Sequence, residues 1–132
     1  MLYTFDTNFV SQVLNNNQIA LSNVRNAIRD GHDVMLNAVC YYEIKRGLHL
    51  PTFQRKDRAF AQLVQDFGML HLDIAALDEA ADIYQVLRRQ GQPIEDADLL
   101  MSAIARANGA TLVTNNTRHF QRVANLQLVD WQ

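Results

Sequence analysis

The sequence predicts an α/β domain, specifically a three-layer α/β/α sandwich around a central, mostly parallel sheet of five strands. Short apolar runs alternate with longer amphipathic runs along the chain, which is the usual order of strands and helices in a parallel sheet. The 132 residues are 48% hydrophobic, which is enough for one compact core, and they include no long linker or internal repeat. We therefore expect residues 1–132 to form a single domain.

The predicted strands are short apolar segments, and the predicted helices are the longer amphipathic ones. The five strands are expected at residues 2–5, 34–37, 69–72, 111–114 and 126–129. The helices are expected at residues 7–14, 18–30, 39–48, 53–67, 77–90, 95–108 and 117–123. Turn residues mark their ends: three asparagines follow the first helix, Pro51 breaks the chain, and glycines follow the helices that end near 30, 67, 90 and 108.

Composition narrows the class of function. The net charge is −2, so any binding to nucleic acid would depend on a local basic patch rather than on an overall positive charge. The single cysteine, Cys40, cannot form an internal disulfide and lies in an apolar stretch, which indicates a buried thiol and a reducing compartment. We see no signal peptide and no run approaching the roughly 18 apolar residues of a membrane span. We therefore expect a soluble, cytoplasmic protein without membrane contact.

Three acidic residues and one asparagine lie at the ends of predicted elements. Asp6 directly follows the first strand, Glu43 lies in the first turns of the helix after the second strand, and Asn116 follows the fourth strand. In a parallel sheet these ends share one edge, which is where ligands bind in α/β folds. Asp98 lies near the start of the helix before the fourth strand. It can join the others only if that helix begins at the same edge.

Each of these acids also has a simpler interpretation. Asp6 could cap the helix that follows it, because aspartate is a preferred N-cap residue. Glu43 could pair with Arg46, which lies three residues further along the same helix. Asp98 could complement the dipole of its helix. For each residue alone these interpretations compete with a functional one, whereas the joint arrangement favours a shared site.

A cluster of carboxylates is electrostatically costly unless a cation neutralises it. Oxygen ligands without a neighbouring group of cysteines or histidines favour Mg²⁺ or Mn²⁺ over Zn²⁺. Such an ion can activate a water molecule and stabilise the charge that builds on a phosphate. The predicted reaction is therefore metal-dependent hydrolysis of a phosphodiester.

Several segments resemble the motifs of PIN-domain ribonucleases, and more specifically of the VapC toxins of bacterial VapBC toxin–antitoxin pairs. They occur in the family's order, at residues 2–8, 42–47, 91–100, 111–120 and 128–131. The resemblance covers essentially the whole chain and implies the PIN fold. It also implies that Asp6, Glu43 and Asp98 bind Mg²⁺, or Mn²⁺ as a substitute, and activate water for RNA cleavage.

The resemblance assigns further residues to the site. Asn116 stands where many family members carry a fourth acid, so it is counted among the catalytic residues. Because Asn116 brings no charge, we expect one well-occupied metal ion. Thr7, Asn8 and Thr114 match supporting positions, where their polar groups either orient carboxylates and water or only cap helices.

The substrate that the resemblance implies is structured RNA, either transfer RNA cut in the anticodon loop or ribosomal RNA. The segment after the fourth strand is similar to that of the subgroup that cleaves initiator transfer RNA. Lys45, Arg46 and Arg118 are candidate phosphate contacts, with a solvated charged face as the alternative. Tyr41 or Tyr42 could stack on a splayed-out base, or pack in the core.

The implied partners are a second copy of the chain and a VapB-type antitoxin. The helices at 39–48 and 53–67 are candidates for the homodimer face and for an apolar groove that accepts an antitoxin helix. The resemblance implies a larger toxin–antitoxin assembly that binds operator DNA only through the antitoxin.

Other classes fit less well. A haloacid-dehalogenase-type phosphatase needs a second aspartate where this chain has Asn8, and a response-regulator receiver needs a lysine after its last strands. The non-enzymatic alternative is a catalytically silent PIN-fold module that binds RNA or protein. The uncharged Asn116 slightly favours it, whereas the three retained acids argue against it.

Overall fold

The computed structural model describes residues 1–131 and confirms the α/β class. In chain order, the elements are β1 (Leu2–Phe5), α1 (Thr7–Leu14), α2 (Gln18–Arg29), β2 (Asp33–Val34), β3 (Leu36–Asn37), α3 (Ala38–Gly47), the 3₁₀ turn η1 (Pro51–Phe53), α4 (Gln54–Phe67), β4 (Met69–Leu70), α5 (Ile74–Arg89), α6 (Asp96–Ala107), β5 (Thr111–Val113), α7 (Thr117–Phe120) and β6 (Gln127–Val129). Each predicted helix and strand segment is present, with ends that differ by a few residues.

The strands pair in parallel, as predicted, but their hydrogen bonds divide them into two groups. A four-stranded sheet has the order β2-β1-β5-β6, and β3 pairs with β4. The division falls inside the predicted strand 34–37. The N–H of Met35 still donates to the carbonyl of Tyr3 (2.9 Å), whereas the N–H of Leu36 donates to the carbonyl of Gly68 (3.0 Å). The predicted strand 34–37 therefore changes its pairing partner after Met35, and its two halves are the strands β2 and β3.

Polar caps fix where several helices begin. Helices α1, α2, α3 and α5 each begin after a side chain that accepts a hydrogen bond from a backbone N–H three residues on, namely Asp6, Asn17, Asn37 and Asp73. The cap at Asp73 explains why α5 begins at Ile74 rather than at the predicted residue 77. Asn37, which the pattern assigned to the end of a strand, also begins a helix.

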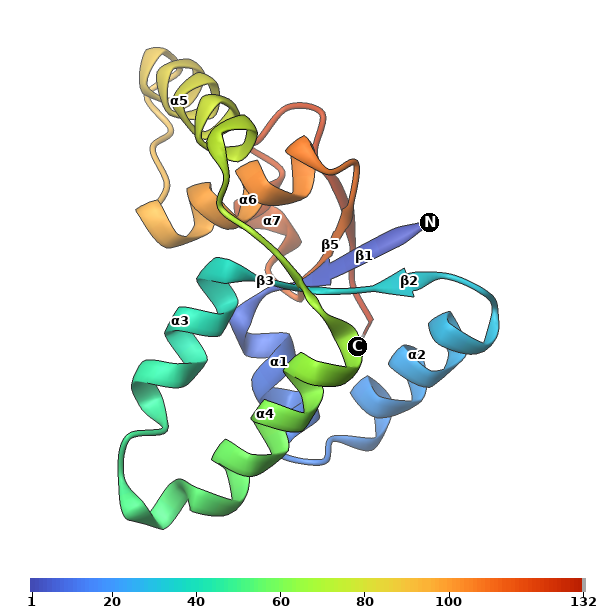
Figure 1. Cartoon of the computed structure of the whole chain (residues 1–132). Helices are drawn as coiled ribbons and strands as arrows, with labels where there is room; N and C mark the ends of the chain where they lie inside the picture. Colours follow the sequence, from blue (N-terminus) through green and yellow to red (C-terminus); the bar gives the residue numbers. More distant parts are fainter. Residues whose placement is uncertain (132) are drawn as a thin grey trace.

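The elements form three layers (Figure 1). The strands run through the middle of the molecule, with α5, α6 and α7 on one side and α1, α2 and α4 on the other. Helix α3 leaves the end of β3 and lies against α1 and α6. Arg106 joins α6 to α5 through Glu79 (2.5 Å) and Asp82 (2.7 Å). This packing fixes the position of α6, the helix that carries Asp98.

The main core surrounds β1 and β5. Phe5, Leu112 and Val113 are each at most 1% exposed, and burying such a side chain contributes roughly 1.5–3 kcal/mol. A second cluster of buried apolar side chains lies between α5 and α6 and includes Ile83 and Leu99. The strand ends that precede Asp6 and Thr114 are therefore held rigidly.

The structure also tests the predictions about Cys40 and the tyrosines. Cys40 is fully buried, and burial raises the pKa of its thiol to about 12, which confirms an inert structural thiol. Tyr41 packs against Phe60, with ring centroids 5.6 Å apart, whereas Tyr42 is 61% exposed and does not belong to the core. None of the helices found within residues 1–131 has the length and apolar character needed to cross a membrane.

Candidate active site

Asp6 lies at the end of β1 and is 5% exposed. Its Oδ1 accepts a hydrogen bond from the backbone N–H of Phe9 (2.9 Å), and its Oδ2 accepts one from the hydroxyl of Thr114 (2.5 Å). Thr114 follows β5, the strand that pairs with β1. The N-cap interpretation of Asp6 is therefore confirmed, and the same bonds fix the direction of the carboxylate at the C-terminal edge of the sheet.

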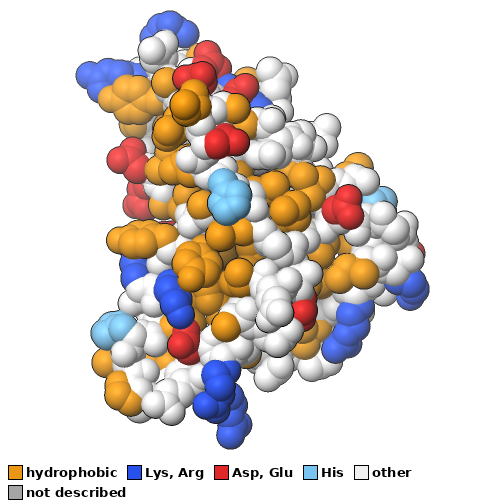
Figure 2. Space-filling view, in the orientation of Figure 1, with side chains coloured by type: hydrophobic (Ala, Val, Ile, Leu, Met, Phe, Trp, Pro, Cys, Tyr) orange, Lys and Arg blue, Asp and Glu red, His pale blue; other side chains and the backbone are white. Residues whose placement is uncertain are grey.

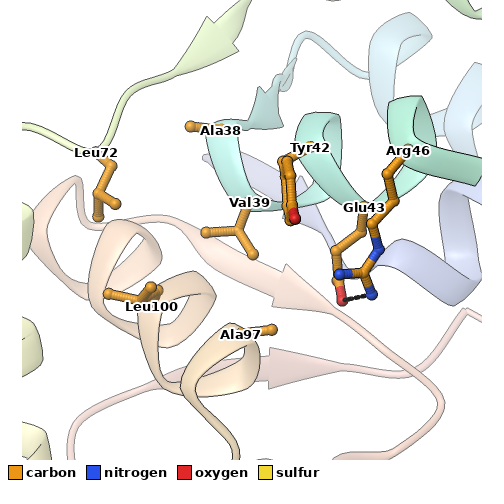
Figure 3. A pocket seen from close by; sticks show the side chains of 8 residues that line it. All are labelled: Ala38, Val39, Tyr42, Glu43, Arg46, Leu72, Ala97 and Leu100. Atoms are coloured by element: carbon orange, nitrogen blue, oxygen red, sulfur yellow. Dashed lines mark hydrogen bonds and ion pairs between the residues drawn. The ribbon is translucent and has the colours of Figure 1, made fainter.

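Glu43 reaches the same region from α3. The hydroxyl of Thr7 donates to its Oε1 (2.5 Å), and the guanidinium of Arg46 lies 3.5 Å from its Oε2. Figure 3 shows the Arg46 side chain turned back toward Glu43 along the helix. The predicted pairing with Arg46 is thus present, while Thr7 brings Glu43 to the first turn of α1, next to Asp6.

The side chain of Asn37 places α3 relative to β1, a role that the sequence pattern did not predict. Its side chain is fully buried, accepts from the N–H of Cys40 (2.9 Å), and donates to the carbonyl of Phe5 (2.9 Å) and the hydroxyl of Thr4 (3.2 Å). The one available signal was the preference of asparagine for the N-cap position before a helix.

Asp98 lies in the first turn of α6. Its Oδ2 lies 3.0 Å from Nε2 of His119, and both side chains are 25% exposed. His119 belongs to α7, the short helix after β5, so the contact joins two elements that the fold brings together at the strand ends. The helix that carries Asp98 therefore begins near the strand ends, as it must if Asp98 is to join the other acids.

The three acids influence one another electrostatically. Burial raises the pKa of Asp6, hydrogen bonds from Thr114 and from the N–H of Phe9 oppose this rise, and the charges of Asp98 and Glu43 add to it. Burial likewise raises the pKa of Asp98, against the effect of His119, and the charges of Glu95 and then of Glu43 add to that rise. The charges of Asp6, Glu43 and Asp98 therefore act on one another, and their role as one shared site stays a prediction.

The match to a known family agrees with this geometry. Residues 3–126 match the PIN domain family, and this span includes all three acids and Thr114. The chain belongs to the PIN-domain family. Its fold is that of solved PIN structures: VapBC2 from Rickettsia felis, solved with a promoter DNA fragment, matches with a TM-score of 0.92 and 22% identity over 100% of both chains.

This PIN domain is also similar to proteins named as VapC ribonucleases. The tRNA(fMet)-specific endonuclease VapC of Shigella flexneri is 40% identical over 68 residues, which is 52% of each chain. Ribonuclease VapC1 of Haemophilus influenzae is 24% identical over 132 residues, covering 99% of this chain and 98% of the relative. The family suggested by the sequence motifs is therefore confirmed.

Three carboxylates supply the oxygen donors of the PIN site, and donors of this kind suit a hard divalent cation. As the side chains stand, no three Asp, Glu, His or Cys residues within 1–131 come together as ligands for one ion. Thr7 and Arg46 engage Glu43, and His119 faces Asp98. Metal binding by all three acids therefore stays a prediction that requires their side chains to turn inward.

The remaining predicted residues differ in what they contact. Asn116 is exposed, and its backbone N–H donates to the Thr114 hydroxyl (2.9 Å). Asn8 and Arg118 are also exposed. Lys45 pairs with Asp57 of α4 (2.8 Å), which turns it away from Glu43. Of the supporting residues, Thr7 and Thr114 contact carboxylates of the site, whereas no such contact is found for Asn8 within the described chain.

Two cavities border Glu43. One, of about 310 Å³, lies between α3 and α6 and is lined mostly by apolar side chains, with Tyr42 and Arg46 at one side (Figure 3). The other, of about 250 Å³, lies between α1, α3 and the start of α4, and includes Thr7, Ile44 and Phe53. Both cavities therefore give a bound molecule direct access to a site carboxylate.

Proposed function

We propose that this PIN domain is a VapC-type toxin and acts as a metal-dependent endoribonuclease. The observation that carries the proposal is the arrangement of three acids from distant segments of the chain. Thr7 links Glu43 to the helix that Asp6 caps, and the segment from Thr114 to His119 contacts both Asp6 and Asp98. The family match and the likeness to named VapC ribonucleases support the same activity.

In this proposal Asp6, Glu43 and Asp98 hold Mg²⁺, with Mn²⁺ as a substitute. The bound ion supplies positive charge for the phosphate and acidifies an attacking water. Thr114 holds Asp6, and Thr7 holds Glu43, so two of the three carboxylates are positioned before substrate binds.

Basic side chains near the edge are proposed to hold the RNA backbone. Arg46 lies over the ring of Tyr42, with its guanidinium carbon 5.2 Å from the ring centroid, and borders the cavity beside Glu43. Arg118 is exposed on α7, close in sequence to Asn116. Lys45 is the weakest candidate because it already pairs with Asp57.

The proposed substrate is a transfer RNA, and initiator transfer RNA is the first one to test. Support comes from the relative named as tRNA(fMet)-specific, which shares 40% identity over about half of each chain. A single-stranded anticodon loop would let a base leave its stack and meet the exposed Tyr42.

The proposed partners are a VapB-type antitoxin and a second copy of this chain. The solved neighbours from Rickettsia felis and Haemophilus influenzae are described as VapBC complexes. The cavity between α1, α3 and α4 is suited to an antitoxin helix, because its apolar lining ends at Thr7 and Glu43. Contact with operator DNA is proposed to occur through the antitoxin alone.

A catalytically silent PIN module is the competing candidate. The exposed and uncharged side chain of Asn116 favours it, because the position often taken by a fourth acid then adds no charge. The retained and mutually close Asp6, Glu43 and Asp98 favour the nuclease.

The test is cleavage of initiator transfer RNA by the purified antitoxin-free protein, in Mg²⁺ and in EDTA. Asp6→Asn should lower the rate about 100-fold or more, because the main charge that binds the ion is lost. Asp30→Asn is the matched control, since Asp30 is an exposed acid beside Arg29 on the far end of α2. Cleavage that persists in EDTA, or that survives Asp6→Asn, would contradict the proposed chemistry, and no cleavage of any RNA would favour the silent module.

A further inference from the structure

The segment from Thr114 to His119, which covers the turn after β5 and most of α7, contacts two of the three acids. At its start, the Thr114 hydroxyl donates to Oδ2 of Asp6 (2.5 Å). At its end, Nε2 of His119 lies 3.0 Å from Oδ2 of Asp98. Two side chains that are five positions apart on one short segment therefore hold carboxylates that come from β1 and from α6.

Asn116 links these two contacts through its backbone. Its N–H donates to the Thr114 hydroxyl (2.9 Å), and its carbonyl accepts from the N–H of His119 (3.1 Å). The Asn116 side chain is exposed and takes part in no hydrogen bond found within residues 1–131. Asn116 therefore shapes the turn, and its side chain does not reach the acids in this arrangement.

His119 is placed by the packing of α7. The next residue, Phe120, is 1% exposed, and its ring meets the imidazole edge-on at a centroid distance of 5.6 Å. Nε2 of His119 is buried, and among the described residues it makes no regular hydrogen bond, so its close contact with Asp98 is not ideally aligned. A buried imidazole nitrogen is costly without a polar partner, and Asp98 is the group that faces it.

We propose that His119, rather than the side chain of Asn116, is the fourth functional side chain of the site and acts as a positioning residue for Asp98. This inference rests on the proposed function. By engaging Oδ2, His119 fixes the rotation of the carboxylate and leaves the second oxygen for the ion. The contact does not require a charged ring, because neutral imidazole can carry its proton on Nε2.

The test measures Mn²⁺ binding to the full-length, antitoxin-free protein by calorimetry and by the loss of the free-ion electron paramagnetic resonance signal. Removing a group that orients a metal ligand commonly weakens metal affinity about 10- to 100-fold. We expect His119→Ala to weaken Mn²⁺ binding by about 10-fold or more. His119→Gln should restore binding to within about threefold of wild type, because the glutamine amide nitrogen can occupy the place of Nε2.

Two further variants sharpen the comparison. His71→Ala removes an exposed histidine from the segment between β4 and α5 and should leave Mn²⁺ affinity unchanged. Asn116→Ala should weaken Mn²⁺ binding less than His119→Ala does. Thermal unfolding in EDTA separates positioning from folding, since a purely structural role would lower the midpoint of His119→Ala without any rescue of metal affinity by glutamine.

Each outcome decides one question. Wild-type affinity in His119→Ala would overturn the inference, as would a larger loss in Asn116→Ala than in His119→Ala. A wild-type protein that binds no Mn²⁺ and cleaves no RNA would instead overturn the proposed function. Wild-type binding with loss in His119→Ala and recovery in His119→Gln would establish the positioning role.

Discussion

Both carboxylate oxygens of Asp6 accept hydrogen bonds within the protein, and the state of this carboxylate affects the stability of the fold. The N–H of Phe9 and the hydroxyl of Thr114 bind it, yet burial and two neighbouring acids still raise its pKa. The hydrogen bonds therefore orient the ionised group without fully offsetting the cost of its charge. A site built in this way is less stable without its cation, which is a common cost of function.

We predict that Asp6→Asn stabilises the metal-free protein at neutral pH. Asparagine is an equally good N-cap, and the Thr114 hydroxyl can rotate to accept from the new amide. Because the folded-state pKa of Asp6 lies above its ordinary value of 3.8, the folded state holds this proton more tightly than the unfolded state does. The free energy of unfolding of the wild type should therefore fall as pH rises from the ordinary pKa of Asp6 to its raised pKa in the folded state.

The measurement is urea unfolding in EDTA at several pH values. The advantage of Asp6→Asn over wild type should grow as pH rises above 3.8 and then level off beyond the raised pKa of Asp6. Asp30→Asn, at an exposed position, serves as the control for removing a carboxylate. An advantage that is constant across pH, or a destabilised variant, would show that ionised Asp6 is not strained in the folded protein.

The sequence identified the acids and two of the residues that hold them, Thr7 and Thr114, but it did not identify Asn37 or His119. Asp6, Glu43 and Asp98 were recognisable because each ends or begins an element in a family motif. Asn37 was predicted only as the end of a strand, because its bond to Phe5 depends on how β3 packs beside β1. His119 was invisible as a partner of Asp98 because that contact joins α7 to α6, and residue spacing does not encode it.

At the scale of elements, one buried side chain joins α3 to β1. Asn37 caps α3 at Cys40 and donates to Thr4 and Phe5, and Phe5 immediately precedes Asp6. Since α3 carries Glu43, this junction sets the separation of two acids. It also lies where the predicted strand 34–37 changes partner, a feature that depends on competing neighbours and that the apolar run alone did not reveal.

We predict that Asn37→Ala lowers the free energy of unfolding by about 2–4 kcal/mol, because it removes a helix cap and leaves the buried carbonyl of Phe5 without this donor. The matched control is Asn17→Ala, which removes the single cap bond of α2 at an exposed position (3.0 Å) and should cost about 1 kcal/mol. Equal losses in the two variants by chemical denaturation would show that the bonds from Asn37 to β1 contribute nothing.

At the scale of the whole molecule, apolar side chains gather on one face. Figure 2 shows hydrophobic side chains over α5 and across the middle of the same face toward α3. Tyr42 of α3 is 61% exposed, and Ile74 and Leu77 at the start of α5 are 76% and 47% exposed. Helix α4, predicted to share the homodimer face, has none of the large exposed hydrophobic side chains found within residues 1–131.

We therefore place the proposed homodimer face on α3 and the start of α5. Exposed apolar groups of this size favour association, because burying them removes them from water. The double substitution Ile74→Asp and Leu77→Asp should convert a wild-type dimer to a monomer, as measured by light scattering coupled to size-exclusion chromatography. Because both positions are exposed, the substitutions should not unfold the monomer. Any decrease in the thermal unfolding midpoint of the double variant should therefore come from loss of the dimer contact. Ile28→Asp, at a 49% exposed position on α2, should remain dimeric. A wild type that is monomeric at every concentration would contradict the homodimer itself, whereas a double variant that stays dimeric would move the interface to another face.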